Sequence, residues 1–139
     1  MLDNIMNILF GKNNGNNRNF GIFSRNRYRN NGGIYNLISF EQAKSMIENN
    51  EVVLLDVRTP NEYELMHIKG AINMPVADID KKIFIYEQAT PIMLYCSSGV
   101  RSKSAINILN NLGYGNIYIW EYGALATFPY KNMLEYHAN

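Results

Sequence analysis

The sequence predicts an α/β domain built on a mainly parallel sheet. From Ile34 onward, short apolar segments rich in β-branched residues alternate with segments of helical periodicity. Two of the apolar segments, "EVVLLDV" and "TPIMLY", are apolar almost throughout, which is typical of strands covered on both faces. An apolar content of 47% in 139 residues supports one domain with a real core.

The first elements have recognisable boundaries. Residues 34–39 are expected to form a short strand, and Ser39 can cap a helix over 40–50 with Gln42 completing a capping box. The apolar run at 51–57 predicts a buried strand. Thr59 and Pro60 then suit the cap and first residue of a helix that reaches His67.

The later elements continue the alternation. In chain order we expect a short strand, a helix, a buried strand, a helix and a last strand at residues 71–75, 78–88, 90–95, 102–112 and 116–120. Gly113 is placed to end the last helix. No internal repeat interrupts this order, so the alternation describes a single unit.

Residues 1–33 differ from the rest of the chain. Ten of them are asparagine, with glycine and arginine interleaved. Such a composition buries too little apolar surface to offset the entropy lost on ordering. We therefore predict a flexible basic leader over 1–33 and a folded domain over 34–139. Within the leader, four apolar residues at helical spacing indicate a short helix at 2–10.

Charge and cysteine content exclude several classes of protein. Residues 1–33 carry five basic side chains and one acidic, whereas residues 34–139 carry eight basic and eleven acidic. The domain therefore lacks the basic surface typical of nucleic-acid binding. One cysteine cannot form an internal disulfide, which fits a reducing, cytoplasmic compartment. No segment approaches the roughly 18–20 apolar residues of a membrane span.

The single cysteine falls where a parallel sheet gathers functional groups. Sites in such sheets form outside the carboxyl ends of the strands. Asp56 follows the apolar run "VVLL", and Cys96 follows "IMLY". If these two strands are neighbours, both residues lie at one edge of the sheet.

The residues after Cys96 suit a thiolate. A loop that leads from a strand into a helix aims several backbone N–H groups at one point, and the helix dipole adds positive potential. Gly99 permits a tight turn, and Arg101 adds a fixed cation. Together these features favour a nucleophilic thiolate and an anionic ligand. The structural alternative is a cysteine that acts only as a small buried hydrophobe.

Other chemistries have less support in the sequence. His67 and His137 are the only histidines, and neither is near Cys96 in the chain. We expect His67 to support a loop, because a thiolate activated by its loop does not need a histidine base. One cysteine and two scattered histidines give no ligand spacing, so we expect no metal and no cofactor.

Three stretches resemble the single-domain rhodaneses. They are "LLDVRTPNEYELMHIKGAINMPV" at 54–76, "CSSGVRS" at 96–102 and "IYIWEYGALATFP" at 117–129, in the family's order and spacing. The resemblance covers about residues 34–130. It implies a rhodanese-like fold, with five mainly parallel strands and helices on both faces. It also implies a sulfurtransferase that moves a sulfane sulfur from a donor such as thiosulfate to cyanide or a thiol through a persulfide.

The resemblance implies roles for individual residues. Cys96 would be the nucleophile and sulfur carrier. Asp56 and Arg58 match the family's Asp-x-Arg and would support the loop and the next helix. The loop residues would cradle the outer sulfur of the persulfide and bind the donor: Ser97, Ser98, Gly99, Val100, Arg101 and Ser102. The implied partners are a small anionic donor, a thiol or cyanide acceptor, and a protein in a sulfur relay.

Two other functions remain open at this stage. A non-catalytic binding or regulatory module is the main alternative; the intact cysteine argues against it, and the basic leader, which could tether an acidic partner, argues for it. Rhodanese-fold phosphatases and arsenate reductases carry one more residue between cysteine and arginine. The four residues between Cys96 and Arg101 suit a sulfur atom better than a tetrahedral phosphate.

The sequence departs from the family at three places. Ser97 follows the cysteine, where the family often has a basic residue, so the sequence does not fix thiosulfate as the donor. Tyr122-Gly123 replaces a pair of glycines, and Phe128 replaces a late tryptophan. Trp120 is therefore expected to pack in the core.

Overall fold

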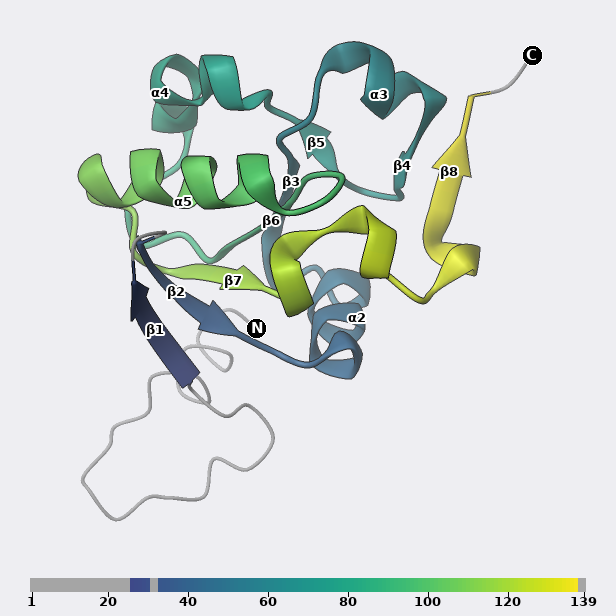
Figure 1. Ribbon diagram of the computed structural model, residues 1–139, viewed down its shortest axis with the longest axis horizontal. Helices are drawn as coiled ribbons and strands as arrows, with labels where there is room; N and C mark the ends of the chain where they lie inside the picture. The colour runs from purple at the N-terminus through teal and green to yellow at the C-terminus, as the bar shows by residue number, and fades with distance from the viewer. Residues whose placement is uncertain (1–25, 31–32, 138–139) are drawn as a thin grey trace.

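A six-stranded sheet forms the centre of the domain (Figure 1). The computed structural model describes residues 26–30 and 33–137. The strand order is β1-β2-β7-β6-β3-β5, and a separate pair, β4 and β8, is antiparallel. The strands are β1 Asn26–Asn30, β2 Gly33–Leu37, β3 Val53–Asp56, β4 Met66–Ile68, β5 Ile72–Asn73, β6 Ile92–Tyr95, β7 Ile117–Ile119 and β8 Leu134–Tyr136.

Helices connect most of the parallel strands. The α-helices are α2 Phe40–Glu48, α3 Pro60–Leu65, α4 Ile79–Lys82 and α5 Val100–Asn111. Short 3₁₀ turns complete the connections: η1 Val76–Asp78, η2 Ile83–Ile85, η3 Glu121–Gly123, η4 Leu125–Thr127 and η5 Lys131–Met133. The predicted α/β class, with five parallel strands, is therefore confirmed.

The sheet has one strand more than predicted. β1 pairs antiparallel with β2 at the edge, although residues 26–30 belong to the segment expected to be a flexible leader. The apolar pattern could not reveal this strand, because "NRYRN" contains a single aromatic residue. The available signal was the dipeptide Asn31-Gly32, which is favoured between the strands of a hairpin. The short helix expected at 2–10 and the rest of the leader lie outside the described residues.

Both faces of the sheet are covered, and strand β6 shows how. Side chains alternate along a strand, so Met93 and Tyr95 pack in the cluster under α2, whereas Ile92, Leu94 and Cys96 pack in the cluster under α4 and α5. Figure 1 shows α2 on one side of the sheet and α4 and α5 on the other. The continuous apolar run before Cys96 is therefore explained by burial on two faces.

The starts of α2 and α3 match the sequence signals more closely than their ends, whereas α5 begins at Val100, two residues before the start expected at 102. Ser39 and Gln42 form the expected capping box on α2, and Thr59 caps α3 with Pro60 in its first turn. The helix expected to continue to His67 ends at Leu65 instead. Residues 66–68 form β4 because they pair with β8, a partner about 68 residues further along the chain.

Trp120 packs in the core as expected. Its ring is fully buried, and its indole N–H donates to the carbonyl of Ala124 over 2.9 Å. It also contacts the rings of Tyr95 and Phe128. Within residues 26–30 and 33–137, no helix is both long enough and apolar enough to cross a bilayer.

Candidate active site

Strands β3 and β6 are neighbours, which brings the two predicted strand ends together. Asp56, the last residue of β3, pairs in register with Tyr95, the last residue of β6. Cys96 follows directly and forms an isolated bridge with Ala124. The expectation that Asp56 and Cys96 share one edge of the sheet is therefore confirmed.

Cys96 lies at the base of a closed loop. Its side chain is fully buried, and its backbone is fixed on both sides: its N–H donates to the Gly123 carbonyl, and its carbonyl accepts from the N–H of Leu125. The N–H of Gly99 donates to Sγ over 3.0 Å. Helix α5 begins one residue later, at Val100, so its first N–H groups, which have no acceptor within the helix, start beside the sulfur.

Gly99 is required by the shape of this loop. Its φ is +108°, in the left-handed region that side chains rarely adopt. A Cβ atom at this position would also lie 2.6 Å from the carbonyl oxygen of Tyr122. The segment around residue 122 therefore lies so close to the loop that it leaves no room for a side chain at position 99.

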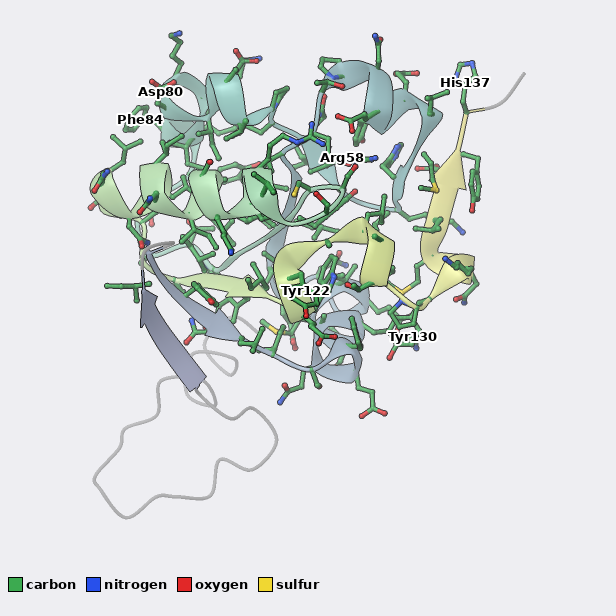
Figure 2. The ribbon with its side chains drawn as sticks, viewed as in Figure 1. Arg58, Asp80, Phe84, Tyr122, Tyr130 and His137 are labelled. Atoms are coloured by element: carbon green, nitrogen blue, oxygen red, sulfur yellow. The ribbon has the colours of Figure 1, made fainter. Side chains whose placement is uncertain are left out.

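The segment opposite the loop contains a further unusual conformation. Tyr122 has a φ of 65°, and Gly123 has a φ of 57°. The resemblance places a pair of glycines at these two positions; this chain has a left-handed backbone at both, with a tyrosine in the first. The ring of Tyr122 is exposed (Figure 2), so the left-handed backbone at this position is not explained by packing of the ring in the core.

The remaining loop residues face different surroundings. Ser98 and Val100 are exposed, and Ser97 and Arg101 are half-buried. Ser102 is buried, and its hydroxyl donates to the carbonyl of Gly123 over 2.7 Å. The side chain of Ser102 therefore fastens α5 to the opposite segment and does not point its hydroxyl at Sγ.

Asp56 and Arg58 form a buried ion pair. The carboxylate accepts from the backbone N–H of Arg58 over 2.9 Å and from its guanidinium over 2.7 to 3.2 Å. The guanidinium also donates to the Met66 carbonyl and lies over the Tyr95 ring. Burial lowers the pKa of Arg58, but the hydrogen bond and charge of Asp56 outweigh this effect and raise it overall. These contacts link the end of β3 to Met66, the first residue of β4.

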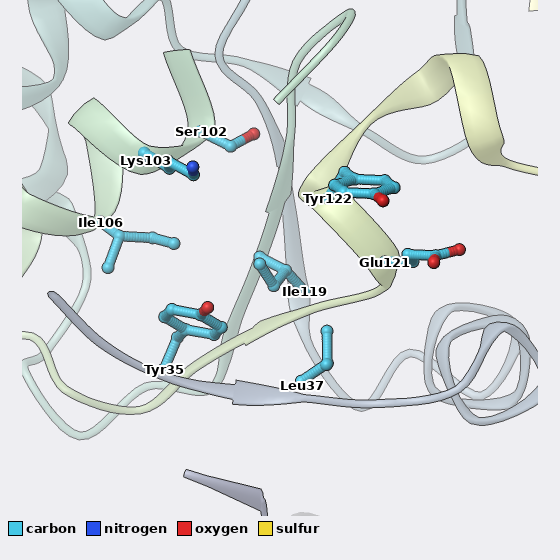
Figure 3. A pocket seen from close by; sticks show the side chains of 8 residues that line it. All are labelled: Tyr35, Leu37, Ser102, Lys103, Ile106, Ile119, Glu121 and Tyr122. Atoms are coloured by element: carbon cyan, nitrogen blue, oxygen red, sulfur yellow. The ribbon is translucent and has the colours of Figure 1, made fainter. Parts of the chain in front are cut away.

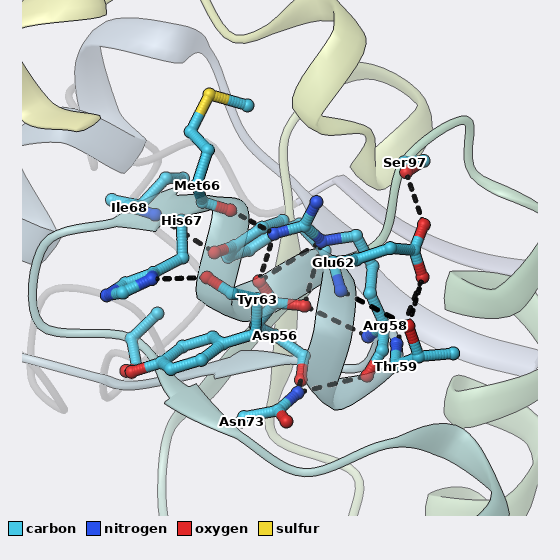
Figure 4. Close-up of polar contacts among 12 residues, drawn as sticks. Asp56, Arg58, Thr59, Glu62, Tyr63, Met66, His67, Ile68, Asn73 and Ser97 are labelled. Carbon is cyan, nitrogen blue, oxygen red and sulfur yellow. Dashed lines mark hydrogen bonds and ion pairs between the residues drawn. The ribbon is translucent and has the colours of Figure 1, made fainter. Parts of the chain in front are cut away.

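Arg101 is paired with a carboxylate that the sequence did not assign to the site. Its Nη1 and Nη2 donate to the two oxygens of Glu62 over 2.6 and 3.0 Å. The hydroxyl of Ser97 donates to the same carboxylate over 3.3 Å, as Figure 4 shows. Arg58, four residues before Glu62 in the chain, is paired with Asp56 and not with Glu62.

The two partners stabilise each other's charged form. The hydrogen bond from Arg101 lowers the pKa of Glu62 strongly; burial opposes this effect, and bonds from Thr59 add to the lowering. The hydrogen bond to Glu62 likewise raises the pKa of Arg101, with smaller contributions from the charges of Cys96 and Asp56. Arg101 is therefore a paired cation at the start of α5; the sequence predicted a fixed cation here but not its carboxylate partner.

Comparisons with known proteins agree with this arrangement. A family model for the rhodanese-like domain matches residues 39–126. The chain belongs to the rhodanese-like family. The "rhodanese-related protein" of Thermoplasma volcanium, a solved structure, is 30% identical with a TM-score of 0.56; the alignment covers 66% of this chain and 87% of that one.

Two relatives of the rhodanese-like domain show how far the likeness extends. Thiosulfate sulfurtransferase PspE of Escherichia coli is 32% identical over 65 residues, which are 45% of this chain and 62% of that protein. A tRNA uridine(34) hydroxylase of Buchnera aphidicola is 32% identical over 95 residues, which are 64% of this chain and 30% of that protein. The chain thus spans less than two thirds of the length of either relative.

Replacing Glu62 with glutamine is expected to make the free energy of unfolding less dependent on pH in the acid range. Because its pKa is lowered from the ordinary 4.5, the ionised carboxylate stabilises the folded rhodanese-like domain above pH 4.5. That contribution is lost as the pH falls further, toward the folded pKa. Urea unfolding should therefore show a larger stability gap between wild type and Glu62→Gln at about pH 7 than at about pH 3. An equal gap at both values would contradict the assigned pair.

His67 has the supporting role expected of it. One ring nitrogen contacts the Tyr63 carbonyl at 2.7 Å, and the other contacts Glu135 at 3.0 Å. The imidazole also stacks on the Tyr63 ring (Figure 4). The side chain therefore links the end of α3 to strand β8. Among the described residues, no three His, Cys, Asp or Glu side chains gather as metal ligands would.

A pocket of about 300 Å³ lies beside the loop, between α5 and strands β2 and β7 (Figure 3). Ser102 and Tyr122 line it on the side of the loop, and Tyr35, Leu37 and Ile119 line it on the side of the sheet. Cys96 is not among the lining residues. The pocket therefore adjoins the rhodanese-like loop without opening onto the sulfur.

Sequence reasoning missed the role of Glu62 at this site. Glu62 lies in the first turn of α3, and Arg101 lies in the first turn of α5. These helices follow β3 and β6, which are adjacent strands, so their first turns meet at the same edge. The signal was therefore that the two charged residues follow the ends of their strands by the same number of residues. It can be used only once those strands are known to be neighbours.

Proposed function

We propose that this domain is a sulfurtransferase that carries a sulfane sulfur as a persulfide on Cys96. The observation that carries the proposal is the contact between the N–H of Gly99 and Sγ, inside a loop that ends at the start of a helix. Backbone N–H groups in that position stabilise negative charge on sulfur, before and after the transfer. We assign the activity to the folded domain predicted over 34–139.

The reaction is written in two balanced steps. In the first, the Cys96 thiolate attacks the outer sulfur of thiosulfate; an S–S bond forms, the sulfur–sulfur bond of the donor breaks, and sulfite leaves with the electron pair. In the second, a thiol or cyanide attacks the outer sulfur of the persulfide. The products are a small persulfide or thiocyanate, and the Cys96 thiolate is regenerated. Neither step needs an external oxidant or reductant.

Each loop residue has a defined part in this proposal. The N–H of Gly99 and the N–H groups at the start of α5 stabilise the persulfide anion. Ser97, Ser98 and Val100 form the rest of the loop, and Ser102 anchors it through the Gly123 carbonyl. Asp56 and Arg58 hold the end of β3 against the loop. The name of the Escherichia coli relative, a thiosulfate sulfurtransferase, supports thiosulfate as the first donor to test.

The test is the intact mass of the protein after incubation with thiosulfate, followed by cyanide. We expect wild type to gain the mass of one sulfur atom and to lose it with cyanide, with thiocyanate released. Because the chain has a single cysteine, Cys96→Ser is an unambiguous control and should gain nothing. A gain retained in Cys96→Ser would place the sulfur elsewhere and overturn the mechanism. The absence of a gain in wild type with thiosulfate and with an organic thiosulfonate would overturn the proposed activity.

A further inference from the structure

Both arginines at the site are already matched by carboxylates. Arg58 is paired with Asp56, and Arg101 is paired with Glu62. These two pairs lie at the ends of adjacent strands, β3 and β6, and each sums to zero charge. Ser97, which could present a donor to an anion, instead donates its hydroxyl to Glu62. The two arginines beside the loop thus add no net positive charge to it.

Glu62 is fixed in this position by five contacts. One oxygen accepts from the backbone N–H and the hydroxyl of Thr59, both over 3.0 Å, and from Arg101 over 2.6 Å. The other accepts from Arg101 over 3.0 Å and from Ser97 over 3.3 Å. The side chains of Glu62 and Arg101 are 34% and 33% exposed, so the pair is open to solvent and to an approaching ligand.

The negative charge of Glu62 is not needed to cap α3. In the capping box of α2, the same N3 position is occupied by Gln42, whose neutral side chain accepts from the N–H of Ser39 over 2.9 Å. The equivalent bond in α3 runs from the N–H of Thr59 to Glu62. Because an amide oxygen can accept this bond equally, the charge at position 62 serves the contact with Arg101 and the loop.

We propose that Glu62 is a specificity-determining residue that selects sulfur donors by charge. The proposal rests on the proposed sulfurtransferase activity. By neutralising Arg101, the carboxylate removes the attraction that a dianion such as thiosulfate would gain at the loop. It favours donors with one negative charge or none. The class that fits is a sulfane sulfur carried on an organic group, such as an alkyl persulfide or an organic thiosulfonate.

The transfer from such a donor balances in the same way as the transfer from thiosulfate. With a thiosulfonate anion, the Cys96 thiolate attacks the outer sulfur, the S–S bond of the donor breaks, and the sulfinate anion leaves. Two negative charges enter the step and two remain in the products. With thiosulfate the reactants carry three negative charges in total, so this donor brings one more negative charge to the loop. Glu62 opposes this additional charge.

The test compares two donors that differ by one charge. Methanethiosulfonate is a monoanion in which a methyl group replaces one charged oxygen of thiosulfate, and both donors form the same persulfide. Removing one negative charge near the loop should raise the rate of persulfide formation. The expected rise is roughly threefold for each negative charge that the donor carries. In Glu62→Gln we therefore expect kcat/KM for persulfide formation to rise by roughly tenfold with thiosulfate and roughly threefold with methanethiosulfonate.

A matched variant separates this effect from a general change in charge. Glu64→Gln removes the same charge from the same short helix, at a more exposed side chain that contacts His137 and not the loop. It should leave the ratio of the two donors at the wild-type value. An unchanged ratio in Glu62→Gln, an equal loss with both donors, or the same shift in Glu64→Gln would overturn the proposal.

A second readout does not depend on sulfur transfer. Iodoacetate and iodoacetamide alkylate the single cysteine and differ by one negative charge. Glu62→Gln should raise the ratio of their rates by roughly threefold, and Glu64→Gln should not. A shift in this ratio without any persulfide formation would support charge selection at Cys96 and count against the sulfurtransferase reaction. Persulfide formation with no shift in either ratio would overturn charge selection alone.

Discussion

Gly99→Ala is expected to reduce persulfide formation by roughly a hundredfold or more, because the methyl group cannot fit in the loop. The Cβ atom would lie 2.6 Å from the Tyr122 carbonyl oxygen, and the φ of +108° is strained for any L side chain. Either the loop or the opposite segment must move. A movement of this kind breaks the bond from the Gly99 N–H to Sγ, which holds the sulfur in place.

Gly70→Ala is the matched control for this variant. Gly70 has a φ of +89°, but no atom lies within 4 Å of the position of its Cβ atom. It lies in the turn between β4 and β5, so its replacement introduces backbone strain without a steric clash and without contact with the loop. We expect Gly70→Ala to lose about 1 kcal/mol of stability and no activity.

Initial rates of persulfide formation and urea unfolding, measured for Gly99→Ala and Gly70→Ala, test these expectations. If Gly99→Ala kept more than about a tenth of the wild-type rate, the bond from Gly99 would not be a main source of stabilisation of the sulfur. If Gly70→Ala lost as much activity as Gly99→Ala, the loss would come from strain in the fold and not from the loop.

The parallel sheet could be predicted because its strands carry local signals. "VVLL" and "IMLY" are buried on both faces, so their apolar character is continuous, and the capping residues Ser39 and Thr59 mark where helices begin. β1 and β4 lack such signals. Both are short strands that exist because of pairing with another segment, and pairing depends on the partner as much as on the strand itself.

Some contacts at the candidate site follow from residues that are close in sequence, whereas its charge balance does not. The position of Cys96, the turn at Gly99 and the pair Asp56–Arg58 each depend on residues that are close in sequence. Glu62 and Arg101 are 39 residues apart, and their contact exists because two helix starts meet at one edge of the sheet. The hydroxyl of Ser102 donates to the Gly123 carbonyl, 21 residues away, and local sequence could not indicate this contact.

Asp56→Asn is expected to destabilise the domain by about 3–5 kcal/mol, because it leaves the charge of Arg58 buried without a carboxylate. The side chain of Asp56 is fully buried, and that of Arg58 is 5% exposed. A loss of this size lowers the melting temperature by on the order of 10–20 °C in a domain of this length. Thermal and urea unfolding measure it directly.

Two further variants show whether the loss comes from the unpaired charge. In Asp56→Asn with Arg58→Met, the buried charge is gone, and we expect a large share of the stability to return. In Glu48→Gln the exposed pair with Lys44 is broken instead, which should cost no more than about 0.5 kcal/mol. A loss in Asp56→Asn as small as that in Glu48→Gln would contradict the role of the pair.

The contacts of Arg58 also indicate which neighbouring parts of the site Asp56→Asn would affect. Its guanidinium donates to the Met66 carbonyl over 2.6 Å and covers the Tyr95 ring, next to the cysteine. The side chain of Asn73 is bonded to the carbonyls of Asp56 and Arg58. Arg58 therefore joins the end of β3 to the start of β4, and Asn73 joins it to the end of β5. Because Cys96 follows Tyr95 directly, we expect Asp56→Asn to lower the rate of persulfide formation even at temperatures where the variant is folded, and the double variant to recover stability more fully than rate.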